Sequence, residues 1–271
     1  MTTPILHFSH GNSFPAGSYT KFFDQLRMDF DIRAVDMYGH DPAYPVSDGW
    51  PKLVEHLIAT LESYGEPSIL VGHSLGGMLS MMAARQRPDL VRCVVMLDSP
   101  VVAGWRAMLW RVVKSKQSWS DYLSPARLSR RRRTVWPSVQ AAYDHFISKP
   151  VFASWAPGVL QDYLEHGLEP HPDGVQLRFS REVETEIYRG LPHHLGSVMD
   201  KAYPVPIGFI AGTESVELRQ AGLDATRKLV GDNFAEIPGG GHLFPMESPE
   251  LAGRLTREMI ARLLAQGQGA G

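Results

Sequence analysis

The chain has 271 residues, of which 44 % are hydrophobic and 21 % are charged, and its formal net charge is −2. This composition is typical of a globular protein made of one large domain, or of a domain with an insertion. Charges so evenly balanced argue against nucleic acid and anionic membrane surfaces as partners.

The single cysteine, Cys93, excludes a disulfide within one chain. It lies in an apolar run, which predicts a buried strand residue rather than a reactive thiol. The sequence shows no leader in which a basic region precedes an apolar stretch, and no apolar window is long enough to cross a bilayer. We therefore expect a cytoplasmic protein without a membrane span.

Short apolar runs alternate with segments of helical period along most of the chain. Several runs are apolar on both faces, as strands of a covered parallel sheet must be. This alternation indicates a doubly wound, mostly parallel α/β sheet. The predicted strands are 5–8, 30–35, 69–71, 93–97, 205–211 and 233–237. The predicted helices are 51–64, 75–87 and one that begins at Ser248-Pro249-Glu250, and residues 266–271 are predicted to be a disordered tail.

The alternation stops between residues 100 and 190. This segment has helix-like stretches and little strand pattern before 175–179. We interpret it as a mainly helical cap inserted into a core of residues 1–99 and 191–265. Its tryptophans either line an apolar substrate pocket or form the core of the cap itself. They are five of the six in the chain: Trp105, Trp110, Trp119, Trp136 and Trp155.

A basic run, Arg130–Arg133, also lies in this segment. We interpret the run as a solvated helix face or loop, since no aromatic pattern of a nucleic-acid site accompanies it.

The motif Gly72-His73-Ser74-Leu75-Gly76 lies between a predicted strand and a predicted helix, and Gly77 follows it. In this context the motif is typical of a nucleophile elbow, which exposes a serine hydroxyl above the sheet. A serine hydroxyl needs a general base to become a nucleophile near neutral pH. We therefore predict that Ser74 is the nucleophile, and that His73 packs locally inside the elbow.

His242 is the predicted general base among the eleven histidines. It follows the last predicted strand in the glycine-rich loop Pro238-Gly239-Gly240-Gly241, which can bring the imidazole back over the sheet. His193-His194 is interpreted as a polar loop, because no further ligand has the spacing of a metal site. No metal is expected.

The chain resembles the α/β-hydrolase superfamily over nearly all of its length. The resemblance rests on His10-Gly11 after the first strand, Asp36-Met37-Tyr38-Gly39-His40 after the second, the Ser74 elbow and the His242 loop. It implies a serine hydrolase of esterase or lipase type with a helical cap. Members often have two strands before the His-Gly strand, but only nine residues precede His10 here. We therefore predict a sheet of about six strands with a shortened N-terminal edge.

In that family, the acid that orients the histidine usually follows the strand after the insertion, where this chain has Ser215. A family variant has the acid after the strand that follows the nucleophile helix. Here that position holds Asp98, and the order Ser74, Asp98, His242 is kept. We predict Asp98 as the acid, with Glu214 and Glu217 as alternatives. Asp98 has a structural interpretation too, because Asp before Ser-Pro favours a turn.

An oxyanion hole needs two backbone N–H groups that face the developing negative charge. Leu75, directly after the nucleophile at a helix N-terminus, is expected to supply one. The resemblance implies that the residue after His-Gly, Asn12, supplies the other. A plain turn rich in Gly, Asn and Pro would have the same sequence.

These residues predict cleavage of an ester or thioester of a small, apolar molecule through an acyl-enzyme, without metal or organic cofactor. Two other readings stay open: a cofactor-free perhydrolase, haloperoxidase or lyase, and a receptor-like protein of this fold that binds a ligand without turnover. A small-molecule substrate is the expected partner, and the oligomeric state, a homodimer being one option, stays open.

Overall fold

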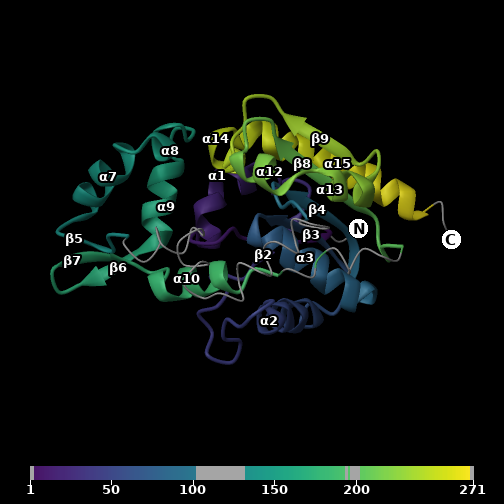
Figure 1. The fold of residues 1–271 in the computed structure, drawn as a ribbon, viewed down its shortest axis with the longest axis horizontal. Coiled ribbons are helices and arrows are strands. Elements are labelled where there is room, and N and C mark those ends of the chain that lie inside the picture. The colour runs from purple at the N-terminus through teal and green to yellow at the C-terminus, as the bar shows by residue number, and fades with distance from the viewer. Residues whose placement is uncertain (1–2, 102–131, 193–194, 196–201, 269–271) are drawn as a thin grey trace.

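A six-stranded parallel sheet forms the centre of the fold (Figure 1). The computed structural model describes residues 3–101, 132–192, 195 and 202–268. Every pair of neighbouring strands in this sheet is parallel, which confirms the predicted sheet of about six strands. In spatial order the strands are β2 (Asp31–Ala34), β1 (Ile5–Ser9), β3 (Ser68–His73), β4 (Val91–Leu97), β8 (Ile207–Gly212) and β9 (Phe234–Ile237).

Helices cover both faces of the sheet, so strands β1, β3 and β8 are buried throughout. One face packs on α2 (Pro51–Glu62) and α3 (Leu75–Gln86), and the other on α1 (Thr20–Asp24) and α15 (Pro249–Gln268). This is why the strands are apolar on both sides. Shorter helices connect them: η1 (Ala16–Tyr19), η2 (Pro88–Leu90), α12 (Val216–Ala221), α13 (Asp224–Val230) and α14 (Phe244–Glu247).

Helix α15 is 20 residues long and continues to Gln268, three residues into the tail for which the sequence predicts disorder. Apolar side chains of one face, such as Ile260 and Leu263, are buried, and this packing holds the helix past the point where its sequence turns polar. Within the described part of the chain, none of the helices combines the length and apolarity needed to cross a membrane.

Between β4 and β8, the described part of the segment predicted as an insertion contains helices and a small antiparallel sheet of order β5-β7-β6, at one end of the central sheet (Figure 1). The predicted strand pattern at 175–179 corresponds to β7, whereas the other two strands were not predicted. They are too short for a period of two to show, and β6 includes Pro170. The elements are β5 (Val135–Trp136), α7 (Val139–Ile147), α8 (Pro150–Ala153), α9 (Val159–Gly167), β6 (Leu168–His171), β7 (Gly174–Leu177) and α10 (Arg181–Arg189).

Trp136 and Trp155 are buried in an aromatic cluster of the insertion. Trp136 packs on Phe146, and Trp155 packs on Phe152 and Tyr163, with ring centroids 4.7–5.7 Å apart. These two tryptophans are therefore core residues of the insertion. The other three that the sequence singled out, Trp105, Trp110 and Trp119, lie outside the described residues.

The basic run is only partly solvated. Arg132 is mostly buried and contacts the Glu184 carboxylate at 3.1 Å and the Tyr163 hydroxyl at 2.5 Å. The interpretation of a solvated run is thus wrong for Arg132, because its charge is balanced inside the protein by Glu184. Arg133 is exposed, and Arg130 and Arg131 lie outside the described residues.

Candidate active site

Ser74 lies in the sharp turn between β3 and α3. Its backbone has φ 52° and ψ −114°, a conformation that L-residues rarely adopt and that is typical of a nucleophile elbow. The Ser74 N–H donates to the Leu97 carbonyl at 3.0 Å, which fixes the turn against the end of β4. Close packing explains the second glycine of the motif, because a Cβ on Gly76 would lie 1.9 Å from the Ser9 carbonyl oxygen.

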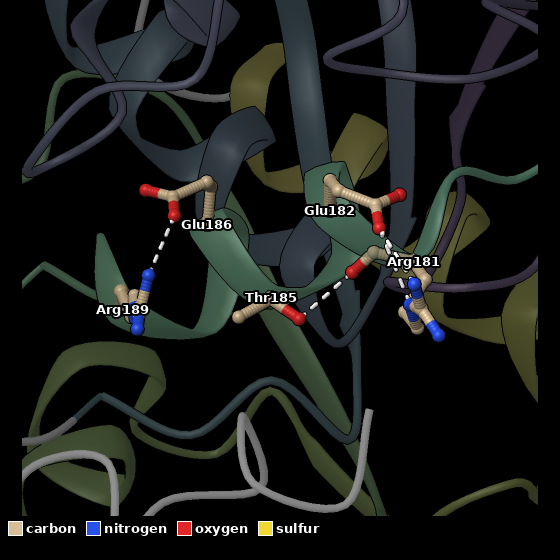
Figure 2. A pocket seen from close by; sticks show the side chains of 5 residues that line it. All are labelled: Arg181, Glu182, Thr185, Glu186 and Arg189. Atoms are coloured by element: carbon tan, nitrogen blue, oxygen red, sulfur yellow. Dashed lines mark hydrogen bonds and ion pairs between the residues drawn. The ribbon is translucent and has the colours of Figure 1, made fainter. Parts of the chain in front are cut away.

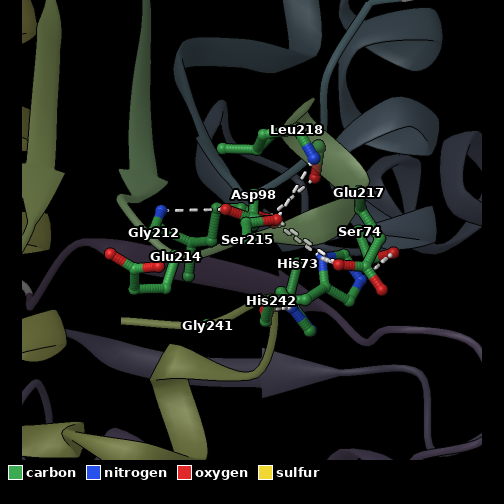
Figure 3. A network of polar contacts seen from close by, with 12 residues as sticks. His73, Ser74, Asp98, Gly212, Glu214, Ser215, Glu217, Leu218, Gly241 and His242 are labelled. Carbon is green, nitrogen blue, oxygen red and sulfur yellow. Dashed lines mark hydrogen bonds and ion pairs between the residues drawn. The ribbon is translucent and has the colours of Figure 1, made fainter. Parts of the chain in front are cut away.

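The imidazole of His242 lies between Ser74 and Asp98 (Figure 3). Its Nε2 is 3.0 Å from the Ser74 Oγ, and its Nδ1 is 2.6 Å from an oxygen of Asp98. Because an ionised carboxylate only accepts hydrogen bonds, Nδ1 carries the proton and Nε2 is left to accept one from the serine hydroxyl. The loop after β9 thus brings His242 to the elbow, as its glycines predicted.

Asp98 follows the end of β4 and is completely buried. Besides His242, its carboxylate accepts hydrogen bonds from the Gly212 N–H at 2.9 Å and from the Ser215 hydroxyl at 2.6 Å (Figure 3). These donors hold the buried charge that an unpaired carboxylate could not keep. Ser215, at the position where the family resemblance implies an acid, therefore donates to the acid of the neighbouring strand.

Neither alternative acid contacts His242 as Asp98 does. Glu214 is exposed and its nearest ion-pair partner is Arg219, at 3.4 Å. Glu217 is half exposed, and its carboxylate oxygen is 4.0 Å from the Nδ1 of His242, beyond hydrogen-bond distance. The geometry therefore brings Ser74, His242 and Asp98 together, and it leaves Glu214 outside this group.

Three carboxylates set the charge around His242. Burial alone would lower the pKa of His242, but the hydrogen bond and the charge of Asp98, with Glu217 and Glu247 farther away, raise it above its usual value. Glu247 also accepts a hydrogen bond from the Gly241 N–H at 2.7 Å. The surroundings of His242 thus favour its protonated form, which is the form that a general base has after it takes a proton.

Asn12 and Leu75 lie at the same edge of the sheet. Asn12 follows β1 and Leu75 follows β3, and these strands pair in parallel with Ser9 opposite Gly72. Neither backbone N–H donates a hydrogen bond to another of the described residues, and Leu75 begins α3, where the helix dipole favours negative charge. The Asn12 side chain is anchored by donating to the Glu184 carbonyl at 3.1 Å.

Two residues of the site were not predicted from the sequence. His73, for which the sequence predicts local packing in the elbow, contacts the Tyr19 hydroxyl at 2.7 Å and the His242 carbonyl at 2.8 Å. Its place next to Ser74 put the ring near the elbow, but the sequence gives no sign of its partners, which are 54 and 169 positions away. Tyr19 lies in η1 without any motif.

A separate surface pocket of about 390 Å³ lies along α10 (Figure 2). Its charged side chains are paired with one another, Arg189 with Glu186 at 2.8 Å and Arg181 with Glu182 at 3.1 Å. None of its lining residues belongs to the group around Ser74.

Comparisons with known proteins agree on the family. The chain is 27 % identical over 260 residues to 2-(acetamidomethylene)succinate hydrolase of Mesorhizobium japonicum, covering 92 % of this chain and 84 % of that protein. It is 37 % identical over 112 residues to Lipase LipV of Mycobacterium tuberculosis, a match that spans only 42 % of the lipase and 40 % of this chain.

Among solved structures, that of E-2-(acetamidomethylene)succinate hydrolase superimposes with a TM-score of 0.76 and 22 % identity, over 96 % of this chain and 92 % of the other. At this identity the likeness concerns the fold. The model of the alpha/beta hydrolase family matches residues 8–252, which is most of the chain. Because this model matches most of the chain, and a hydrolase is similar to the chain over 92 % of its length, the chain belongs to the alpha/beta hydrolase family.

Proposed function

We propose that the chain is a serine hydrolase that cleaves an ester or thioester of a small, apolar substrate through an acyl-enzyme. One observation carries the proposal: the continuous contact from Ser74 Oγ through the His242 ring to the buried Asp98, at 3.0 and 2.6 Å. A nucleophile, a base and an acid in this order are the parts that acyl transfer requires.

In the first step, the Ser74 oxygen attacks the substrate carbonyl while His242 Nε2 takes the hydroxyl proton. The bond from Nδ1 to Asp98 keeps the ring in the tautomer that can accept this proton, and the Asp98 charge stabilises the imidazolium that forms. The raised pKa of His242 supports this role, because Asp98 and the nearby carboxylates stabilise the protonated form of the ring.

The tetrahedral intermediate needs donors for its oxyanion. We assign this task to the backbone N–H groups of Asn12 and Leu75, which have no partner among the described residues. Each such donor typically accounts for ~10²–10³-fold in rate. The N-terminus of the 12-residue helix α3 adds a favourable dipole at the same point.

Collapse of the intermediate releases the alcohol or thiol, to which His242 returns the proton, and leaves the acyl group on Ser74. A water molecule then attacks the acyl carbonyl, with His242 taking its proton, and the acid product leaves. The same residues serve both half-reactions.

An aromatic environment next to the loop that contains Asn12 supports an apolar substrate. Phe14, two residues after Asn12, packs on Trp155 and Tyr163 of the insertion, with ring centroids 5.8–5.9 Å apart. The insertion thus packs on this loop through apolar side chains, and from this we propose an apolar acyl or alcohol group.

The test is labelling with a fluorophosphonate probe, followed by hydrolysis of nitrophenyl esters of varied chain length. We expect the parent to be labelled once and to hydrolyse short apolar esters, and Ser74→Ala to lose both. Ser63→Ala is the matched control, because its exposed hydroxyl contacts only the Thr60 carbonyl. A Ser74→Ala protein that is labelled and turns over like the parent would overturn the proposal.

Two other outcomes would replace the proposal with a different activity of the same site. Oxidation that depends on halide and peroxide, or elimination without hydrolysis, would identify a perhydrolase or a lyase. Tight ligand binding with negligible turnover would identify a receptor-like protein.

A further inference from the structure

We propose that Tyr19 and His73 form a positioning pair that fixes the loop after β1, which contains Gly11 and Asn12, relative to the loop after β9, which contains His242. The inference rests on the proposed function, because it assigns the pair a part in that reaction. Neither residue needs to touch the substrate; each acts through a neighbour that does.

The pair links three segments by short contacts. The Gly11 N–H donates to the Tyr19 hydroxyl oxygen at 2.9 Å, and this oxygen is 2.7 Å from the Nδ1 of His73. On the other side of the ring, Nε2 is 2.8 Å from the backbone carbonyl of His242. The line therefore runs from the residue before Asn12, through the residue before Ser74, to His242.

The direction of every proton along this line is determined. A carbonyl oxygen only accepts, so the Nε2 of His73 must carry the hydrogen that it donates to His242. The Nδ1 of a neutral imidazole is then an acceptor, and it receives the Tyr19 hydroxyl hydrogen. The remaining lone pairs of the tyrosine oxygen accept the Gly11 N–H. Each group has the partner that its chemistry requires, so the arrangement admits one tautomer.

Burial keeps the pair in this state. Both side chains are at most 1 % exposed, and burial, with the nearby His242 and His10, lowers the pKa of His73 to about 3. The ring is therefore neutral near pH 7. Packing fixes the tyrosine as well, since its ring contacts Phe8 and Phe23 at centroid distances of 4.6 and 6.3 Å.

Gly11 is the point where the pair meets the loop. A Cβ at this position would lie 2.8 Å from the Nδ1 of His73 and 3.0 Å from the Tyr19 hydroxyl oxygen. Only a glycine lets the backbone approach the pair so closely, which places the N–H of the following Asn12 relative to Ser74. A misplacement of about 1 Å in such groups is enough to cost ~10²-fold in rate.

The first experiment compares Tyr19→Phe with Tyr38→Phe. Tyr38 is a matched control: it is equally buried, and its hydroxyl contacts a buried histidine, His7, at 3.1 Å and Ser9 at 3.1 Å. Both variants keep the aromatic ring and lose one buried hydroxyl. We expect Tyr19→Phe to lower kcat and the rate of fluorophosphonate labelling about 10-fold or more with KM within about 2-fold, and Tyr38→Phe to change neither.

The inference is overturned if Tyr19→Phe keeps the parental kcat, or if Tyr38→Phe lowers kcat as much. If both variants lose kcat to the same extent, the loss reflects the stability that a buried hydroxyl adds, and not positioning. Unfolding measurements would then show the same decrease in the free energy of unfolding for both proteins.

A second pair of variants separates the two ends of the His73 ring. The amide of Gln reaches the position of Nε2 and can still donate to the His242 carbonyl, whereas that of Asn reaches the position of Nδ1. We expect His73→Gln to retain several-fold more kcat than His73→Asn. The reverse order would contradict a role at the His242 carbonyl.

A readout without turnover keeps this test apart from that of the proposed function. The proton between His242 Nδ1 and Asp98, in a contact of 2.6 Å, is expected as a low-field signal in proton NMR spectra. We expect Tyr19→Phe to shift or broaden this signal and Tyr38→Phe to leave it in place. If the parent hydrolyses no ester, the proposed function fails, and this signal still decides whether the pair positions His242. An unchanged signal in Tyr19→Phe overturns the inference.

Discussion

Two buried tyrosines, Tyr19 and Tyr38, lie on opposite faces of β1 and have nearly the same local chemistry. Tyr19 packs on Phe8, and Tyr38 contacts the next side chain along the strand, that of His7. Each hydroxyl meets a buried neutral histidine. They differ in what that histidine contacts next.

On the Tyr19 side, the histidine contacts the backbone of His242. On the Tyr38 side, His7 contacts the hydroxyl of Tyr64 at 2.7 Å, and the ring of Tyr64 lies under Arg33 of the edge strand β2. Burial and hydrogen-bond number are therefore alike in the two regions, and they do not distinguish a residue that positions reacting groups from one that holds the sheet together. The final partner of each hydrogen-bond network makes this distinction: it is His242 for Tyr19, and Tyr64 for Tyr38.

The largest effect is expected on the Tyr19 side, at Asp98, whose carboxylate is 2.6 Å from the Nδ1 of His242. Asp98→Asn keeps the shape of the side chain but replaces the acceptor of the Nδ1 hydrogen, so the ring is no longer held in the tautomer that accepts a proton from Ser74. We expect kcat/KM for a nitrophenyl ester to fall by ~10³–10⁴-fold.

Glu214→Gln and Glu217→Gln are the controls, and each should keep most of this activity. A collapse of activity in one of them, with Asp98→Asn near the parental value, would move the acid to that residue and separate Asp98 from the reaction.

Acid unfolding should involve both sides of β1. Burial lowers the pKa of His7 and of His73 to about 3 and that of His10 to about 4, from 6.5. Below pH 6.5 the unfolded chain binds protons that the folded chain does not, so the free energy of unfolding decreases as the pH is lowered. Above pH 6.5 these groups have no effect. Each such histidine lowers the free energy of unfolding by about 2 kcal/mol between pH 7 and pH 5.

Urea unfolding at the two pH values measures this loss, and His7→Gln tests its source on the Tyr38 side. The variant should lose less stability than the parent on the change from pH 7 to pH 5, and we expect it to hydrolyse a nitrophenyl ester at pH 7 as fast as the parent does. An equal pH-dependent loss in both proteins would show that His7 is protonated in the folded state.

The smallest effect concerns the charge near His242. Glu217 raises the pKa of His242 from 4.0 Å away, and its half-exposed carboxylate is screened by solvent. In the proposed reaction His242 must be neutral to act as the base, so we expect activity to decrease as the pH falls through this pKa. Glu217→Gln should move the acid limb of the kcat/KM profile to lower pH by about a few tenths of a unit. A limb that moves to higher pH would contradict this arrangement of charges.

Much of the sheet and the elbow could be predicted from local sequence, because their signals are local. Runs that are apolar on both faces mark strands such as β3 and β4, and the spacing of Gly72 and Gly76 marks the turn that they enclose. The family resemblance, with Ser215 at the usual acid position, pointed to Asp98, and the structure places its carboxylate 2.6 Å from the Nδ1 of His242. For the strands and the elbow, the residues that decide the structure lie within a few positions of each other.

The parts that could not be predicted depend on contacts between distant residues. The charge of Arg132 looked solvated because its partner, Glu184, is 52 positions away. Strands β5 and β6 are too short to show a period, and they exist because β7 pairs with both. The pairing of Tyr19 with His73 has no local signal, since only the packing of η1 against the sheet brings the two together.

The anchoring of Asp98 has a consequence for the order in which the site is assembled. The acid is at the end of β4, but two of its hydrogen-bond donors, Gly212 and Ser215, are supplied from beyond the insertion, 114 and 117 positions later. During synthesis, therefore, a nascent chain that has produced the elbow and its acid still has this carboxylate without those donors. The acid is paired only after β8 has emerged from the ribosome and docked beside β4.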